Sequence, residues 1–220
     1  MPPLPPSNKA VFINCPFDPK YTPLFEAIIF TVFSLGFAPR CSKEIDDGGV
    51  RINRIIRIIG ECRYGIHDIS RTQLDEKNRL PRFNMPLELG IDMGCRYLSS
   101  DKQHKRKSQL ILDKDPYRFQ KFISDIAGQD PKAHQNKPKE VIKLVRNWLK
   151  TSSGKNGLPA AAFVQSEYAR FRRDLRRICK TLGFDEIPYA DYCGIVSDWL
   201  KKRKAKLGKK PTGRGKRRKG

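Results

Sequence analysis

Several features that would place this chain in a familiar class are missing from its sequence. No run of apolar residues approaches the ~18 that a membrane-spanning helix requires. Residues 1–6 have neither the charged nor the apolar region of a secretion signal. The six cysteines form no CxxC pair and follow no regular spacing, unlike the disulfide frameworks of small secreted domains. We therefore expect a cytoplasmic protein with reduced, packed thiols and no membrane partner.

The common cofactor and catalytic motifs are also absent. The sequence contains no GxGxxG or GxxxxGK[ST] stretch, so it has neither a dinucleotide fingerprint nor a phosphate-binding P-loop. It contains no GxSxG nucleophile elbow. The three histidines and scattered cysteines show no metal-ligand spacing. We expect no metal and no resident cofactor.

Positive charge is abundant but uneven. The formal net charge is +22, and residues 201–220 hold 12 Lys and Arg and no acidic residue. Glycine, proline and cations dominate the last part of the chain, so we expect a disordered basic tail over 207–220. A polycation of this kind binds phosphate backbones without sequence preference. Nonspecific nucleic-acid binding through 201–220 is therefore one candidate function.

The order of apolar patterns predicts an α/β fold. Apolar content of 38% in 220 residues is enough for a substantial core. Alternating strand and helix patterns are typical of a mainly parallel sheet covered on both faces, here a flavodoxin- or Rossmann-like three-layer sandwich. Strands are expected at 10–15, 37–41, 64–69, 109–112 and 132–134, and helices at 22–36, 51–62, 85–98, 116–127 and 139–150.

The chain divides into four predicted segments. An extended leader over 1–9 precedes the α/β domain at 10–150. A polar stretch of Ser, Gly, Lys and Asn then leads to a helical hairpin at 158–206. The hairpin is too small to be expected as an independent domain, so we expect it to pack on the sheet domain or on a second copy of the chain. The tail over 207–220 follows.

Polar residues gather near the ends of the predicted strands. In an open α/β sheet, ligands bind at the carboxyl edge of the strands. Asp68 lies near the end of strand 64–69, and Glu88 lies at the start of a helix after a loop rich in donors. Two acids with amide and guanidinium donors suggest a nucleotide or sugar site. The further candidate ligand-binding residues are Asn14, Pro16, Phe17, Asp18, Asp46, Asp47, Ser70, Arg71, Arg82 and Asn84.

Plainer interpretations of these residues remain open. An acid in the first turn of a helix interacts favourably with the helix dipole, which would explain Glu88 without a functional role. Pro16 and Phe17 are equally suited to shaping a turn, and the acidic loop at 44–49 to facing solvent. Structural or surface roles are expected for the other polar residues. His67 is expected to be a packed histidine, and Asp92 to form a helix-surface ion pair with Arg96. His104 and His134 are expected in exposed loops.

Three short motifs resemble a known superfamily. The stretches Phe-Ile-Asn-Cys-Pro-Phe at 12–17, Ile-His-Asp-Ile at 66–69 and Pro-Leu-Glu-Leu-Gly-Ile at 86–91 resemble nucleoside 2-deoxyribosyltransferase-like proteins and the related TIR-like domains. The chain is also similar to bacterial TIR-like proteins with a CPFD…HDISR…FNMPxELG pattern. The resemblance covers roughly residues 10–150. The sequence departs from the family pattern at Asn14-Cys15, where a glycine is usual, and at 82–86, where bulky residues precede Glu88.

The resemblance implies cleavage or transfer at an N-glycosidic bond. Glu88 would be the nucleophile or would stabilise the oxocarbenium ion, and Asp68 would bind or protonate the leaving base or contact the sugar. Arg71 and Arg82 favour a phosphorylated ligand, so NAD or another nucleotide is the first expected substrate. The family also implies bacterial stress or phage defence and assembly into homo-oligomers. A nucleotide sensor that uses the same pocket without turnover is an alternative.

Overall fold

The computed structural model describes residues 6–44, 49–72, 74, 79 and 81–208. Their strands form one five-stranded sheet in the order β2-β1-β3-β4-β5, and every neighbouring pair is parallel. This is the flavodoxin-like strand order, and it confirms the expected α/β class. The strands are β1 (Ala10–Asn14), β2 (Ala38–Arg40), β3 (Tyr64–Asp68), β4 (Ser108–Asp113) and β5 (Lys132–Ala133).

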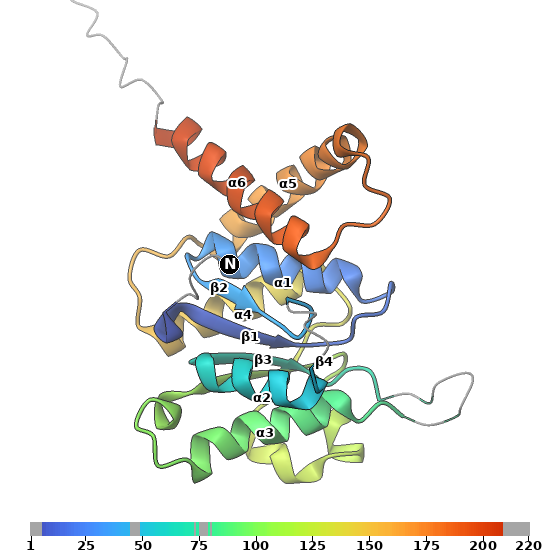
Figure 1. The fold of residues 1–220 in the computed structure, drawn as a ribbon, viewed down its shortest axis with the longest axis vertical. Coiled ribbons are helices and arrows are strands. Elements are labelled where there is room, and N and C mark those ends of the chain that lie inside the picture. Colours follow the sequence, from blue (N-terminus) through green and yellow to red (C-terminus); the bar gives the residue numbers. More distant parts are fainter. Residues whose placement is uncertain (1–5, 45–48, 73, 75–78, 80, 209–220) are drawn as a thin grey trace, which may run out of the picture.

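Helices cover both faces of the sheet (Figure 1). On one face lie α1 (Thr22–Ser34) and α4 (Pro138–Ser153), and on the other lie α2 (Arg51–Glu61) and α3 (Asn84–Leu98). Successive strand side chains point to opposite faces, which divides the core. Val11 and Ile13 join the cluster under α1 and α4, whereas Phe12 packs with Ile58 of α2.

The helix expected at 116–127 is wrong. Two short 3₁₀ segments, Arg118–Lys121 and Ser124–Gln129, occupy this region instead. Tyr117 has a φ of 58°, and a left-handed residue cannot continue a right-handed helix. Phe119 and Ile126 are buried beside α3, so apolar burial holds the segment without helical regularity.

The helical hairpin consists of α5 (Ala161–Leu182) and α6 (Tyr189–Gly208), which lie over α1 (Figure 1). Phe171 of α5 and Val196 of α6 are completely buried, in the same hydrophobic cluster as α1 and α4. The hairpin therefore extends one face of the sheet domain and shares its core. The predicted tail falls almost wholly on 209–220, outside the described residues, as does the start of the leader.

All six cysteines are free thiols, and Cys15, Cys41 and Cys62 are buried. None of the helices in the described part of the chain combines the length and apolarity needed to cross a bilayer.

Candidate functional site

A small pocket lies at the carboxyl edge of the sheet, between the first turns of α2 and α3. Both helices begin at this edge because each follows a parallel strand. The pocket has a volume of about 260 Å³. Its lining combines three apolar side chains with an acid, a cation and an amide: Ile52, Ile55, Leu87, Glu88, Arg51 and Asn84.

Glu88 is the acid in this pocket, and it is only 7% exposed. Burial raises its pKa to about 7, against an ordinary value of 4.5, although the charge of Arg51 acts in the opposite direction. Among the described residues, no hydrogen bond or salt bridge involves its carboxylate. Glu88 is thus a buried acid whose oxygens remain available to a ligand.

Donors surround the mouth of the pocket. Arg51 is exposed at the first position of α2, and its Nη2 donates to Ser42 Oγ at 3.2 Å. Asn84 is exposed at the first position of α3. Neither helix has a side chain that caps its first turn. The start of such a helix favours an anion because its free N–H groups and dipole are positive, so this arrangement suits a phosphate.

A buried chain of polar contacts fixes the start of α3 against the sheet. Asn14, at the end of β1, donates through Nδ2 to the Met85 carbonyl at 2.8 Å and contacts His67 Nδ1 at 3.1 Å. Because Nδ2 can only donate, His67 Nδ1 accepts and its Nε2 carries the proton. That Nε2 lies 2.8 Å from Asp92 Oδ2. The candidate Asn14 therefore positions the helix that carries Glu88, one turn from Met85.

Asp92 also forms a buried ion pair with Lys107. Lys107 Nζ lies 3.0 Å from Asp92 Oδ1 and donates to the Ile59 carbonyl at 2.7 Å. Burial tends to raise the pKa of Asp92, but the hydrogen bond from His67 and the charge of Lys107 outweigh it and lower the pKa. The expected surface pair between Asp92 and Arg96 is wrong, because Asp92 faces the sheet, where a charge must be compensated.

Gly65 makes room for this network. A Cβ at Gly65 would come closest to Asp92 Oδ2 and would lie 2.7 Å from His67 Nε2. Since neither buried side chain can withdraw without breaking the other's contacts, we expect Gly65→Ala to lower the free energy of unfolding by roughly 2–3 kcal/mol. The urea midpoint measures this effect.

Gly90→Ala is the matched control, because no atom lies within 4 Å of a Cβ at that position of α3. It should be neutral or stabilising by up to ~1 kcal/mol, as expected for alanine in a helix. Equal urea midpoints for the two variants would contradict the close packing at Gly65.

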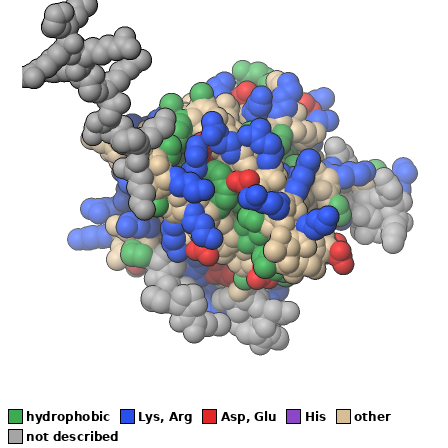
Figure 2. Space-filling model, turned by 90° about the horizontal axis from the view of Figure 1, so that it is seen from above, with side chains coloured by type: hydrophobic (Ala, Val, Ile, Leu, Met, Phe, Trp, Pro, Cys, Tyr) green, Lys and Arg blue, Asp and Glu red, His purple; other side chains and the backbone are tan. Residues whose placement is uncertain are grey.

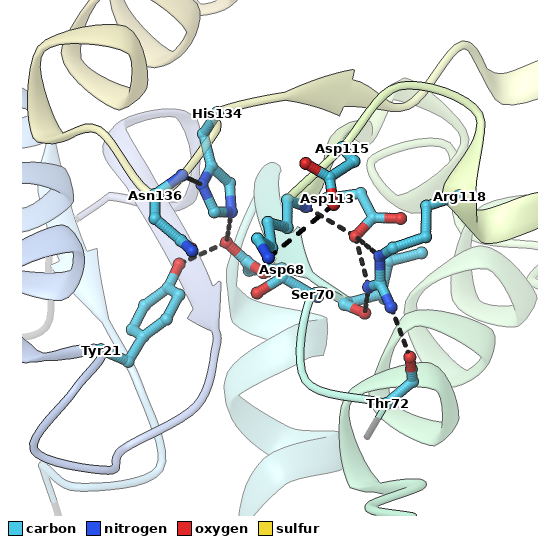
Figure 3. Close-up of polar contacts among 11 residues, drawn as sticks. Tyr21, Asp68, Ser70, Thr72, Asp113, Asp115, Arg118, His134 and Asn136 are labelled. Atoms are coloured by element: carbon cyan, nitrogen blue, oxygen red, sulfur yellow. Dashed lines mark hydrogen bonds and ion pairs between the residues drawn. The ribbon is translucent and has the colours of Figure 1, made fainter.

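Asp68 lies in a second buried network (Figure 3). Its Oδ2 accepts a hydrogen bond from the Tyr21 hydroxyl and faces His134 Nε2 at 3.0 Å, and its Oδ1 accepts from the Ser70 N–H at 2.9 Å. Burial tends to raise the pKa of Asp68, but the hydrogen bond and charge of His134, with the other donors, lower it. Asp68 is therefore held as an anion.

This network bears on two expectations, and it corrects the one for His134. Asp68 is 0% exposed and its carboxylate accepts hydrogen bonds from the protein, so its contact with a sugar or a leaving base stays a prediction. His134 was expected at the surface but is completely buried. The Asn136 N–H donates to its Nδ1 at 2.9 Å, which leaves the proton on the Nε2 that faces Asp68.

A neighbouring cluster ties down the loops after β3 and β4 (Figure 3). Arg118 forms an ion pair with Asp113 and donates to Thr72 Oγ1 at 2.8 Å and to the Ile69 carbonyl at 3.1 Å. These contacts occupy the guanidinium, so the cluster belongs to the scaffold of the edge.

Two predicted ligand-binding residues pair with each other. Arg71 Nη2 lies 3.1 Å from Asp18 Oδ1, which also accepts from the Tyr21 N–H at 3.0 Å. This joins the loop after β1 to the loop after β3. Phe17 packs edge-on against Phe25 at 5.3 Å between ring centroids, which supports its plainer interpretation as part of the turn.

The remaining candidates have different surroundings. Pro16 and Ser70 are buried, and Ser70 offers its backbone N–H to Asp68. Arg82 is exposed shortly before α3. Asp46 and Asp47 lie outside the described residues. Of the predicted site residues, only Asn84 and Glu88 line the pocket together.

Cys15 directly follows β1 and lies close enough to Asp68 and Glu88 for their charges to affect the pKa of its thiol. Burial raises the pKa of its thiol well above the ordinary value, and the carboxylates of Asp68 and Glu88 raise it further. A nucleophilic cysteine needs its thiolate, so Cys15 is suited to packing.

No protein-family model, curated protein or solved structure matches this chain. Within the described ranges, no group of three or more His, Cys, Asp or Glu residues could hold a metal ion.

Sequence reasoning did not identify Arg51, Tyr21 or His134 as part of this edge. Arg51 follows an acidic, glycine-containing loop and begins a helix, which is a usable signal for a carboxyl-edge position. Tyr21 and His134 carry no local signal, because their shared partner Asp68 is brought to them only by the fold.

Proposed function

We propose that the pocket between α2 and α3 binds a nucleotide and that Glu88 promotes cleavage of its N-glycosidic bond, as in the TIR-like and deoxyribosyltransferase-like proteins. The observation that carries this proposal is the Glu88 carboxylate: it is buried, lines a pocket at the sheet edge and has no hydrogen-bonding partner among the described residues.

The chemistry requires a carboxylate in this position. When the bond between the anomeric carbon and the base nitrogen breaks, positive charge develops on the sugar. A preorganised anion stabilises that charge most strongly where water is excluded. Water then adds to the anomeric carbon and releases a proton. A purine or pyrimidine base that leaves as an anion takes up a proton, whereas nicotinamide leaves NAD as a neutral molecule and needs none.

The pocket suggests how a nucleotide would lie. A volume of about 260 Å³ is just below the ~300 Å³ at which drug-sized ligand sites begin. It therefore suits a sugar with part of its base better than a whole dinucleotide. Ile52, Ile55 and Leu87 supply apolar walls. The phosphates would lie outside, toward Arg51 and the first turns of the helices, and this favours a nucleotide or NAD over a free nucleoside.

Release of the free base tests this function. Purified protein at high concentration, to allow any assembly, is incubated with NAD, nucleotides and deoxynucleosides, and the products are separated by chromatography. Free nicotinamide or nucleobase is the expected product. No release from any of these compounds would contradict glycosidic cleavage.

We expect kcat/KM for base release to rise as the pH increases from 6 to 8. Glu88 must be ionised to stabilise a cation, and its pKa of about 7 means that the active anion forms across this interval. A pH–rate profile with an apparent pKa near 7 would agree. A rate that falls over the same range would instead indicate that Glu88 acts in its protonated form.

One observation favours the alternative of a nucleotide sensor. Asp68 is occupied by Tyr21, Ser70 and His134, so the described pocket has no second acid to protonate a leaving purine or pyrimidine base. A sensor needs only the binding surface. Binding of a nucleotide in calorimetry without base release would support this function.

A further inference from the structure

The helical hairpin contains a second concave surface, remote from the sheet-edge pocket. Helices α5 and α6 diverge above α1 (Figure 1) and enclose a groove of about 560 Å³ between them. Lys and Arg side chains gather over this face of the molecule, with apolar side chains among them (Figure 2). Six cations line the groove: Arg170, Arg173, Arg177, Lys202, Arg203 and Lys206.

Half of these cations have no anionic partner in the described part of the chain. Arg203 binds Glu167 through two nitrogens, at 2.6 and 3.1 Å. Arg173, Lys202 and Lys206 are exposed, and none of them forms a hydrogen bond or salt bridge there. Their charges therefore remain available to an external anion.

The two acids in the groove do not neutralise these free cations. Asp174 accepts a hydrogen bond from Trp199 Nε1 at 2.8 Å, and Asp198 lies 3.3 Å from Lys201. Both carboxylates are already engaged at the groove wall. The field in the groove is thus positive, which attracts polyanions.

The spacing of the cations suits a chain of phosphates. Arg170, Arg173 and Arg177 lie on one face of α5 and span about 10 Å at 1.5 Å per residue. Lys202 and Lys206 lie one turn apart on α6. Two rows of cations face each other across the groove, an arrangement that can follow a phosphate backbone.

The floor of the groove is apolar. Ile178, Leu182 and Trp199 line it, and the Trp199 ring is held against Phe171 with centroids 5.5 Å apart. Unpaired bases pack against such surfaces while cations hold the backbone. A duplex keeps its base faces stacked inside, and a bilayer surface does not enter a groove, so neither uses this floor.

We propose that the groove between α5 and α6 binds single-stranded nucleic acid, with Arg173, Lys202 and Lys206 contacting phosphates. Residues 209–220 add seven Lys and Arg and no acid to the sequence, so the full chain offers a polyanion further positive charge. This proposal is independent of the function proposed for Glu88.

The test measures binding of a fluorescein-labelled 15-nucleotide oligo-dT by fluorescence anisotropy. The full chain is compared with a variant carrying Arg173→Gln, Lys202→Gln and Lys206→Gln. We expect affinity to fall at least tenfold. The slope of log K against log salt should decrease by about 2, since each lost single-strand phosphate contact contributes about 0.7.

The matched control removes three charges elsewhere, through Lys102→Gln, Lys105→Gln and Arg106→Gln. These residues are exposed and lie in or next to the 3₁₀ turn His104–Arg106, which packs against α3. The control should change affinity less than threefold. Equal weakening in the two variants would overturn the proposal, because any loss of charge would then suffice.

Two further comparisons decide between sources of the signal. In the first, the seven cations of 209–220 are changed to Gln in the full chain, and the groove substitutions are then expected to weaken oligo-dT binding as before. If they have no effect in this background, the tail and not the groove binds the oligonucleotide, and the proposal is overturned. Tighter binding to a 15-base-pair duplex, or groove-dependent binding only to vesicles containing phosphatidylserine, would also overturn it.

Discussion

Glu88→Gln is expected to lower kcat for base release by about 1,000-fold, because the transition state then loses the anion that stabilises its positive charge. Glutamine has nearly the same shape, so the pocket should keep its form. Nucleotide affinity, measured by calorimetry, should change less than about threefold if binding rests on Arg51, the helix starts and the apolar wall. Chromatographic assay of both proteins at pH 8 gives the comparison.

Glu186→Gln makes the same chemical change at an exposed acid in the loop between α5 and α6. It should leave base release unchanged. Equal activity in wild type and Glu88→Gln would remove Glu88 from the mechanism. Binding by both proteins with no turnover by either would shift the function to a sensor.

The same substitution should stabilise the protein in neutral and alkaline solution. The folded state holds the Glu88 proton up to a pH of about 7, whereas an ordinary glutamate releases it near 4.5. Between these values the unfolded state binds fewer protons, so the free energy of unfolding falls as pH rises. The loss approaches about 3 kcal/mol at pH 8 and is absent below about pH 4.

Urea unfolding at pH 8 and at pH 4.5 checks this expectation. Glu88→Gln should be more stable than wild type at pH 8, with the difference shrinking toward zero at pH 4.5. Its amide cannot ionise, so it avoids the cost of a buried charge. A variant less stable than wild type at pH 8 would show that the Glu88 carboxylate has a stabilising partner. A buried carboxylate that lowers the stability of the protein but can act on a ligand is typical of a functional site.

Asp92→Asn is expected to lower the free energy of unfolding by roughly 3–5 kcal/mol, because it leaves the charge of Lys107 buried without an anion. The Lys107 side chain is 2% exposed, so it cannot reach water without moving. His67 would also lose its charged acceptor. The start of α3 depends on this network through Asn14, so base release should fall together with stability.

Asp115→Asn is the control, since Asp115 is half exposed and lies 4.0 Å from Lys114. Exposed pairs contribute only ~0–1 kcal/mol. Adding Lys107→Met to Asp92→Asn should recover part of the loss, since the uncompensated charge is then removed. A cost below about 1 kcal/mol for Asp92→Asn would mean that the pair is not buried in solution.

The secondary structure could be predicted from the sequence where the pattern of apolar residues and the order of the elements agree. The apolar stretches at 10–15 and 64–69 correspond to β1 and β3, and the spaced isoleucines at 51–62 to α2. The segment 116–127 has similar apolar content but does not form the predicted helix. Tyr117 adopts a left-handed conformation and Arg118 is drawn toward Asp113. These tertiary contacts outweigh the local preference of this segment for a helix.

The alternating elements, and hence the parallel sheet, follow from the order of amino acids alone, because periodicity and connection order depend on neighbouring residues. The same local pattern places Glu88 and Asn84 at one helix start. The surroundings of the two acids follow from the tertiary structure, and a carboxylate's chemistry depends on those surroundings. Asp68 contacts Tyr21 and His134 from distant segments, whereas Glu88 lines a pocket together with Arg51 and has no hydrogen-bonding partner among the described residues. Burial raises the pKa of one acid, while donors lower the pKa of the other.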